Sequence, residues 1–67
     1  MADGEVYFEF VQVGPQMRVA AIDVATAIEV IVITPVTASK YQMQQMALNK
    51  LRKKLSETPH EAPRKLF

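Results

Sequence analysis

The sequence of 67 residues contains no cysteine and no tryptophan, two glycines and a single histidine. The absence of cysteine excludes disulfide bonds, thiolate metal sites and a cysteine nucleophile. Two separate glycines do not make a glycine-rich phosphate-binding loop. One histidine with scattered carboxylates does not supply the several fixed ligands that a metal ion needs. The sequence therefore predicts a protein that is not an enzyme and that uses no cofactor, no metal and no small-molecule substrate.

The titratable residues nearest to a catalytic pattern have simpler structural explanations. His60 follows Pro59 in a stretch without periodicity, whereas a catalytic base must be held within hydrogen-bond reach of its substrate. Asp23 and Glu29 flank an expected turn, where paired carboxylates could perform acid–base chemistry. A turn aspartate more often accepts hydrogen bonds from backbone amides, and a strand glutamate more often faces solvent. We therefore expect His60 to be a solvated side chain, and Asp23 and Glu29 to have structural roles.

The length permits one small domain. A chain of this size buries only about 60% of the surface that its unfolded form exposes, so domains below about 70–80 residues usually need extra support. Without disulfides, that support must come from close packing or from self-association. Residues 58–67 contain two prolines and several charged side chains without an apolar period. We therefore predict a single domain over residues 1–57 and a disordered tail over residues 58–67.

Three strand-length segments occupy the first half of the chain, over residues 5–13, 17–24 and 28–34. Their apolar residues are largely β-branched or aromatic, as is typical of strands. The connections are short: Gly14-Pro15-Gln16 forms the first turn, and residues 24–27 form the second. A parallel crossover needs a dozen or more residues, so these strands pair antiparallel in sequence order. The pattern predicts a three-stranded meander.

A helix is expected after Pro35, which cannot donate a hydrogen bond to a strand neighbour. Thr37 or Ser39 is the expected N-cap, and Ser39 with Gln42 fits a capping box. The helix should end near Ser56. The predicted fold class is α+β, a three-stranded antiparallel β-meander followed by one C-terminal α-helix. At 100° per residue, the stripe expected to face the sheet contains Tyr41, Leu48, Leu51 and Leu55.

The sheet is apolar on both faces. Val6, Phe8 and Phe10 share the face that we expect under the helix. An antiparallel sheet with a solvated face usually alternates between apolar and polar residues, but the third segment does not. We therefore expect a second copy or another protein on the second face, with homodimerisation through it and through the third strand's edge as the main hypothesis. The predicted contact residues are Tyr7, Val11, Val13, Val19, Val30, Val32, Met43 and Met46.

Charge is distributed unevenly along the chain. Residues 1–39 carry five carboxylates and one arginine, a net charge of −4, whereas residues 40–67 carry seven basic residues and two glutamates, a net charge of +5. Such asymmetry can indicate a nucleic-acid surface, and it can also indicate two elements that attract each other. Helical angles place Lys53 apart from Lys50 and Lys54, and Arg52 nearly opposite Lys50. Weak nucleic-acid binding through this basic patch is the alternative function; the main hypothesis is a non-catalytic interaction or accessory module.

The stretch of residues 19–36 is long enough and apolar enough to raise the question of a membrane-spanning segment. Asp23 and Glu29 interrupt the stretch, and a carboxylate near the bilayer centre costs about 2.5–3.5 kcal/mol. Its apolar residues also separate into two strand-length runs, as in a hairpin. The N-terminus is acidic where a signal peptide is basic. We expect a cytoplasmic protein without a membrane association.

Turn and core residues form a further pattern, made of Phe8-Glu9-Phe10-Val11, Val13-Gly14, Ala21-Ile22-Asp23, Thr26, Glu29-Val30, Pro35 and Ala47-Leu48-Asn49-Lys50-Leu51. Over residues 6–55 this pattern resembles a family of short, uncharacterised bacterial proteins without an established function. The resemblance implies a bacterial cytoplasmic domain of sheet-then-helix type and no substrate. The chain has Ala27 where the family pattern has glycine after the turn threonine, and an alanine at positive φ is strained.

Overall fold

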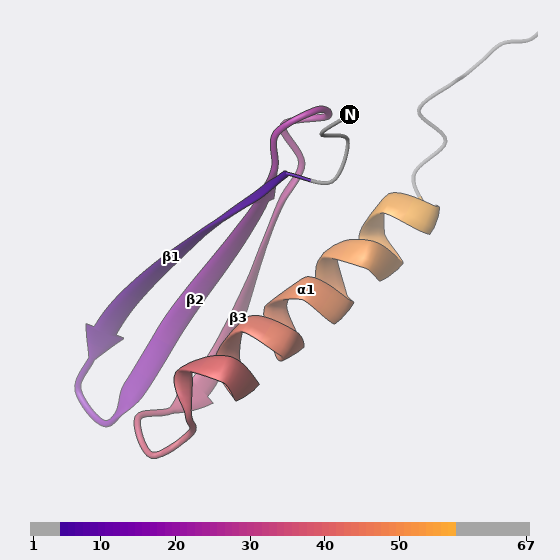
Figure 1. The fold of residues 1–67 in the computed structure, drawn as a ribbon. Coiled ribbons are helices and arrows are strands. Elements are labelled where there is room, and N and C mark those ends of the chain that lie inside the picture. Colours follow the sequence, from indigo (N-terminus) through magenta and orange to yellow (C-terminus); the bar gives the residue numbers. More distant parts are fainter. Residues whose placement is uncertain (1–4, 58–67) are drawn as a thin grey trace, which may run out of the picture.

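The computed structural model describes residues 5–57. Its elements are β1 (Val6–Val13), β2 (Gln16–Asp23), β3 (Glu29–Pro35) and α1 (Lys40–Glu57). The strands form one antiparallel sheet in the order β1-β2-β3, and α1 lies across one face of it (Figure 1). The predicted α+β fold, a meander followed by a helix, is confirmed. The predicted tail, with His60, lies outside the described residues.

The first turn is one residue shorter than the sequence suggested. Val13 pairs with Gln16, so the loop contains Gly14 and Pro15 alone. Gly14 has a φ of 60°, and glycine at the first central position followed by proline fits a type II′ turn. The backbone N–H of Val36 donates to the Pro15 carbonyl oxygen at 3.2 Å, which ties the end of β3 to this turn.

The second turn is organised by Asp23. One carboxylate oxygen of Asp23 accepts hydrogen bonds from the Thr26 backbone N–H at 2.9 Å and from the Thr26 hydroxyl at 2.7 Å. The Asp23 carbonyl oxygen accepts from the Ala27 N–H at 2.7 Å. Ala27 has a φ of 61°, in the left-handed region where glycine is favoured. The expected structural role of Asp23 is thus confirmed. The backbone of Ala27 is strained, because an alanine has a side chain that disfavours positive φ.

The expected capping box opens α1. The Ser39 hydroxyl oxygen accepts from the Gln42 backbone N–H at 3.0 Å, and the Gln42 side-chain oxygen accepts from the Ser39 N–H at 2.9 Å. Two backbone donors without helical partners are thereby satisfied. The cap fixes where the helix starts and therefore which of its residues meet the sheet.

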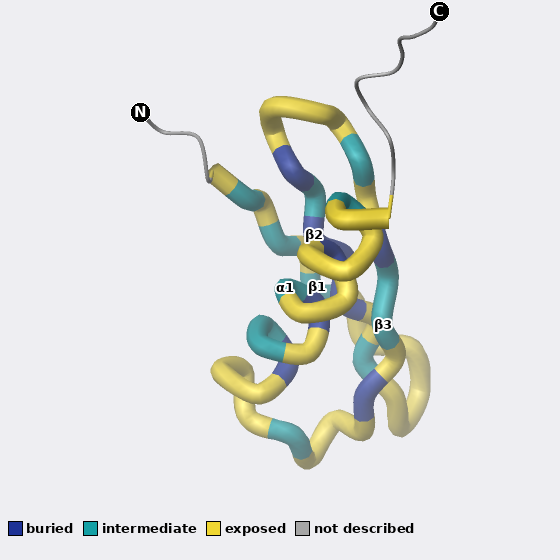
Figure 2. Tube along the Cα trace, turned by 90° about the vertical axis from the view of Figure 1, so that its right-hand side faces the viewer, coloured by how far each residue is buried: buried dark blue, intermediate teal, exposed yellow. Residues whose placement is uncertain are grey.

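The core lies between α1 and the inner face of β2 and β3. Buried positions follow the middle of the sheet and the side of the helix that faces it (Figure 2). Val6, Phe8 and Phe10 lie on the same face, as expected, but on β1 they are only partly buried. The buried cluster consists of Val19, Ala21, Val30, Met43, Ala47 and Leu51.

The two-residue turn corrects the predicted assignment of faces. A shift of one residue in register moves every side chain of a strand to the opposite face. With Val13 paired to Gln16, Val19 lies opposite Phe10 and Val32, on the inner face. Val30 pairs with Ala21 on the same face. Val19, Val30 and Val32 therefore belong to the core side of the sheet and not to the second face.

The helix stripe also differs from the prediction. Met43, Ala47 and Leu51, four residues apart in succession, are buried against the sheet. Tyr41 is 69% exposed, so it does not belong to the stripe. Met43 was expected on a partner surface but is 5% exposed, because the inner stripe is centred one position away from the predicted one.

Candidate functional site

The face of the sheet that α1 does not cover is the candidate site, and we call it the outer face. It retains four exposed apolar side chains: Tyr7, Val11, Val13 and Ile33, with exposed fractions of 59%, 47%, 58% and 52%. Tyr7, Val11 and Val13 were predicted for this surface. From β1 to β3, three rows cross the face: Tyr7/Ile22/Glu29, Glu9/Ala20/Ile31 and Val11/Arg18/Ile33.

Three charged side chains interrupt the apolar surface. Arg18 occupies the central strand, while Glu9 and Glu29 lie on the strands at either side of it. Together with Val11, Ala20 and Ile31, these residues line a hollow of about 40 Å³. Within residues 5–57, Arg18 forms no ion pair with either carboxylate. The outer face thus presents charges of both signs that have no partner among residues 5–57.

The two turn carboxylates are not placed for acid–base chemistry. Asp23 is on the inner face and is 9% exposed, whereas Glu29 is exposed on the outer face, opposite Ile22. The sheet separates them, and Asp23 is bonded to Thr26. Across the described part of the chain, no three histidine, cysteine or acidic residues lie close enough together to hold a metal ion.

The predicted basic patch divides between two sides of α1. Lys50, Lys53 and Lys54 line one hollow of about 310 Å³ beside Val30, together with Glu57. Lys53 therefore lies with the other two lysines, in contrast to the prediction, because positions 50, 53 and 54 span about a quarter of a helical turn's circumference. Arg52 lines a different hollow.

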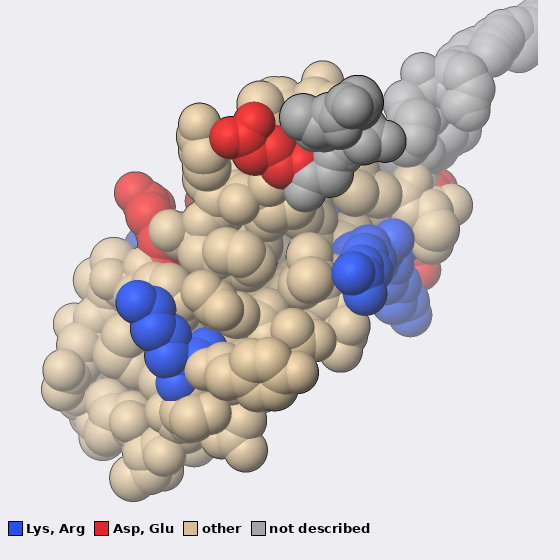
Figure 3. Space-filling model, viewed as in Figure 1, with Lys and Arg blue, Asp and Glu red and all other residues tan. Residues whose placement is uncertain are grey.

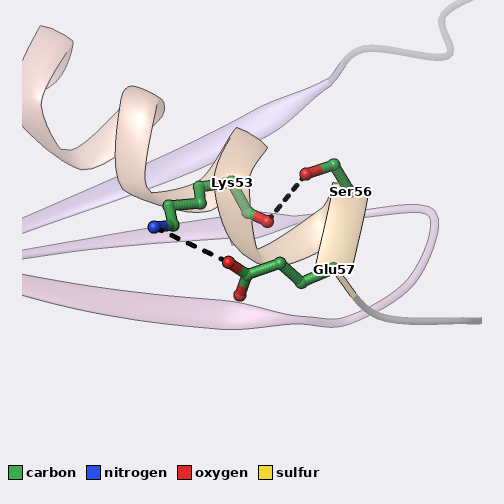
Figure 4. Close-up of polar contacts among 3 residues, drawn as sticks. All are labelled: Lys53, Ser56 and Glu57. Carbon is green, nitrogen blue, oxygen red and sulfur yellow. Dashed lines mark hydrogen bonds and ion pairs between the residues drawn. The ribbon is translucent and has the colours of Figure 1, made fainter.

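Lys50 and Lys53 make defined polar contacts with other parts of the chain. The Lys50 ammonium donates to the Ile31 carbonyl oxygen at 2.8 Å. Lys53 lies 3.7 Å from the Glu57 carboxylate, and the Ser56 hydroxyl donates to the Lys53 carbonyl oxygen (Figure 4). The Lys53–Glu57 pair is exposed, and such pairs add little to stability.

The sequence did not predict an opening between β1 and α1, which we call the β1–α1 groove. The helix packs mainly on β2 and β3, so the inner face of β1 is left partly uncovered. One hollow of about 370 Å³ and another of about 320 Å³ follow this side of the sheet. The first is lined by Val6, Phe8, Asp23, Leu48, Leu51, Arg52 and Leu55, and the second by Phe10, Met17, Lys40 and Met43.

The last predicted contact residue, Met46, is 47% exposed on α1. Because α1 packs on the inner face, Met46 and the outer face lie on opposite sides of the sheet. They do not form one continuous surface. None of the helices that the structure describes is sufficiently long and apolar to cross a membrane.

Comparison with known proteins gives one result. Neither the curated proteins nor the solved structures contain a significant match. A family model described as Domain of unknown function (DUF6898) matches residues 3–58, which include every strand and the helix. The match supports the expected uncharacterised domain family. The chain therefore belongs to this family of domains of unknown function.

Proposed function

We propose that the protein is a non-catalytic interaction module that acts as a homodimer through the outer face of its sheet. The observation that supports this most directly is the exposure of Tyr7, Val11, Val13 and Ile33 on one face. Clustered apolar surface on a small protein is typical of an interaction site. Burying it against a second copy would also supply the support that a short chain without disulfides needs.

The charges on the outer face favour a second copy as the occupant. A symmetric interface is self-complementary, so each residue must meet a suitable residue of the same surface. Consider a twofold axis that lies between the two sheets, runs across the strands and passes midway between the Glu9/Ala20/Ile31 row and the Val11/Arg18/Ile33 row. Such an axis places the first row of each copy over the second row of the other copy. Arg18 then enters the hollow over the partner's Ala20 and lies beside the partner's Glu9. The small Ala20 side chain leaves the room that the guanidinium group needs.

Charge reversal tests this arrangement. We expect Arg18→Glu to shift the dimer to monomers in sedimentation velocity, because it places like charges next to each other across the interface. The double variant Glu9→Arg/Arg18→Glu should restore the dimer, because the pair is regenerated with its signs exchanged. Arg52→Glu, on α1, is the matched control and should remain dimeric. A dimer that Arg18→Glu leaves intact, or that the double variant does not restore, would contradict the arrangement.

Weak nucleic-acid binding remains the second candidate, and one observation favours it: Lys50, Lys53 and Lys54 line the same hollow. Glu57 lies among them, Lys50 is bonded to β3, and Arg52 lines another hollow, so the patch is less basic than its composition suggests. Phosphate contacts lose affinity steeply as salt rises. Titration of a labelled oligonucleotide at two salt concentrations, with the Lys50→Gln/Lys54→Gln variant as comparison, distinguishes this function from an apolar dimer.

The cytoplasmic location and the bacterial origin belong to the same proposal. The location is supported by the interruption of the apolar stretch with Asp23 and Glu29, and the origin by the pattern of turn and core residues. Fractionation of cells that express the protein with a C-terminal epitope tag tests the location.

A further inference from the structure

We propose that the β1–α1 groove binds an extended peptide segment of a partner protein, with apolar side chains at every second position and acidic side chains near its ends. The segment would add to the free edge of β1 as a fourth strand. The groove lies on the face of the sheet opposite the dimer surface, so this site is independent of the proposed homodimer.

The edge of β1 is available for strand addition. In an antiparallel pair the backbone groups of successive residues alternate between facing the neighbouring strand and facing away. The Glu5 carbonyl oxygen accepts from Val24 N–H at 3.2 Å, on the β2 side, so the backbone groups of Val6, Phe8 and Phe10 face away from β2. Within residues 5–57 these outward groups have no hydrogen-bond partner. At the β3 edge of the sheet, by contrast, the Lys50 ammonium already donates a hydrogen bond to the Ile31 carbonyl oxygen.

The floor of the groove suits apolar side chains. The Phe8 and Phe10 rings stack with their centroids 6.5 Å apart and remain partly exposed. A strand added to β1 has the same two-residue period, so every second side chain would point over these rings and into one of the two hollows. Main-chain hydrogen bonds with alternate side chains in pockets are the usual mode of strand addition.

The basic residues at the groove determine the charge of the partner. Lys40 contacts the Phe10 ring, with its ammonium 5.1 Å from the ring centroid, near the start of α1. Arg52 lines the other hollow, near the end of α1. Figure 3 shows basic side chains at two separate places on the face that α1 covers, with uncharged surface between them. The one acidic residue of the groove, Asp23, already accepts two hydrogen bonds from Thr26.

Selection from a displayed library of random twelve-residue peptides against the full chain tests the proposal. We expect enriched peptides to alternate apolar with other residues. They should carry two acidic residues about five or six positions apart, because Lys40 and Arg52 are separated by a rise of about 18 Å along α1 and a strand rises about 3.3 Å per residue. In ¹⁵N-labelled protein they should shift the backbone amide signals of residues 6–12 and of α1, while the signals of Ala20 and Ile31, on the outer face of β2 and β3, stay unchanged. The absence of enriched peptides, or signal changes confined to the outer face, would overturn the proposal.

Variants of the two basic residues provide a second readout. Lys40→Glu/Arg52→Glu should weaken binding of an enriched peptide at least tenfold, whereas the control Lys53→Glu/Lys54→Glu, with the same change in net charge, should change it less than twofold. Equal weakening by both would assign the effect to net charge and contradict a groove site. Because the signal mapping uses the unaltered protein, the test does not depend on the folding of a variant. Dimer mass is measured separately, so failure of the groove and failure of the dimer remain distinguishable.

Discussion

The Lys50 ammonium of α1 donates a hydrogen bond of 2.8 Å to the backbone carbonyl oxygen of Ile31, at the outward edge of β3. An exposed strand edge is a template for pairing with further chains, and natural proteins often guard such edges with lysine. The contact therefore covers the middle of β3. It favours contact between copies through the outer face of the sheet over pairing of β3 edges, which was part of the expectation from sequence.

Replacement of Lys50 by alanine tests the guarding role. We expect Lys50→Ala to cost only about 0.5–1.5 kcal/mol of unfolding free energy, because one exposed hydrogen bond is lost. It should, however, increase assembly beyond the dimer, measured by light scattering after incubation. Lys53→Ala removes an equal charge but leaves the hydrogen bond from Lys50 to Ile31 in place, and it should not increase assembly. If both variants assembled to the same extent, the edge contact would have no protective role.

Asp23 should contribute to stability through its hydrogen bonds to Thr26. Asp23→Ala removes both bonds from a nearly buried position and should lower the unfolding free energy by about 1–3 kcal/mol. Glu29→Ala, at the exposed other end of the same turn, should change it by about 0.5 kcal/mol or less. Urea denaturation at one fixed protein concentration compares the two variants. Equal losses would show that the turn does not depend on the Asp23 carboxylate.

Ala27→Gly should stabilise the protein. A left-handed backbone conformation costs an alanine about 1–2 kcal/mol, and glycine avoids this cost. Glycine, however, loses more conformational entropy on folding, which offsets part of the gain. We expect a net gain of about 0.5–1 kcal/mol, seen as a higher midpoint of thermal unfolding. Ala25→Gly is the matched control, since Ala27 is the one non-glycine residue with positive φ among residues 5–57. It should lower the midpoint, and a similar decrease with Ala27→Gly would contradict the strained turn.

The position of the helix stripe predicts a large difference between two substitutions on α1. Leu51 is 1% exposed, so Leu51→Ala should cost about 2–5 kcal/mol, a large part of the stability of so small a domain. Tyr41 is 69% exposed, so Tyr41→Ala should cost about 0.5 kcal/mol or less. Circular dichroism in urea measures both. Comparable losses of unfolding free energy would show that Tyr41 packs against the sheet as Leu51 does, and would contradict the observed position of the stripe.

Local signals explain why the elements could be predicted. The capping box at Ser39 and Gln42, the turn around Asp23 and the apolar composition of the strands all act over a few residues. Such signals are readable in a single sequence, because their partners are close along the chain. The order of elements and the antiparallel meander followed from them.

The faces were harder to predict, because they depend on a loop length that differs by one residue. A turn at Gly14, Pro15 and Gln16 would place Val19 outside, whereas the observed loop of Gly14 and Pro15 places it inside. Val30 and Val32, on a strand that is apolar at successive positions, give no independent signal of register. The groove was not predictable either, because it results from the position of α1 over β2 and β3.

The most direct test of the proposed homodimer is the mass of the protein in solution, measured by light scattering over a dilution series at low and at high salt. The chain has a mass of 7.5 kDa, so the proposal predicts about 15 kDa, twice that value. Contact through apolar side chains should keep this mass at high salt, because burial of apolar surface is not screened by ions. A mass of 7.5 kDa at every concentration and salt would contradict the central claim.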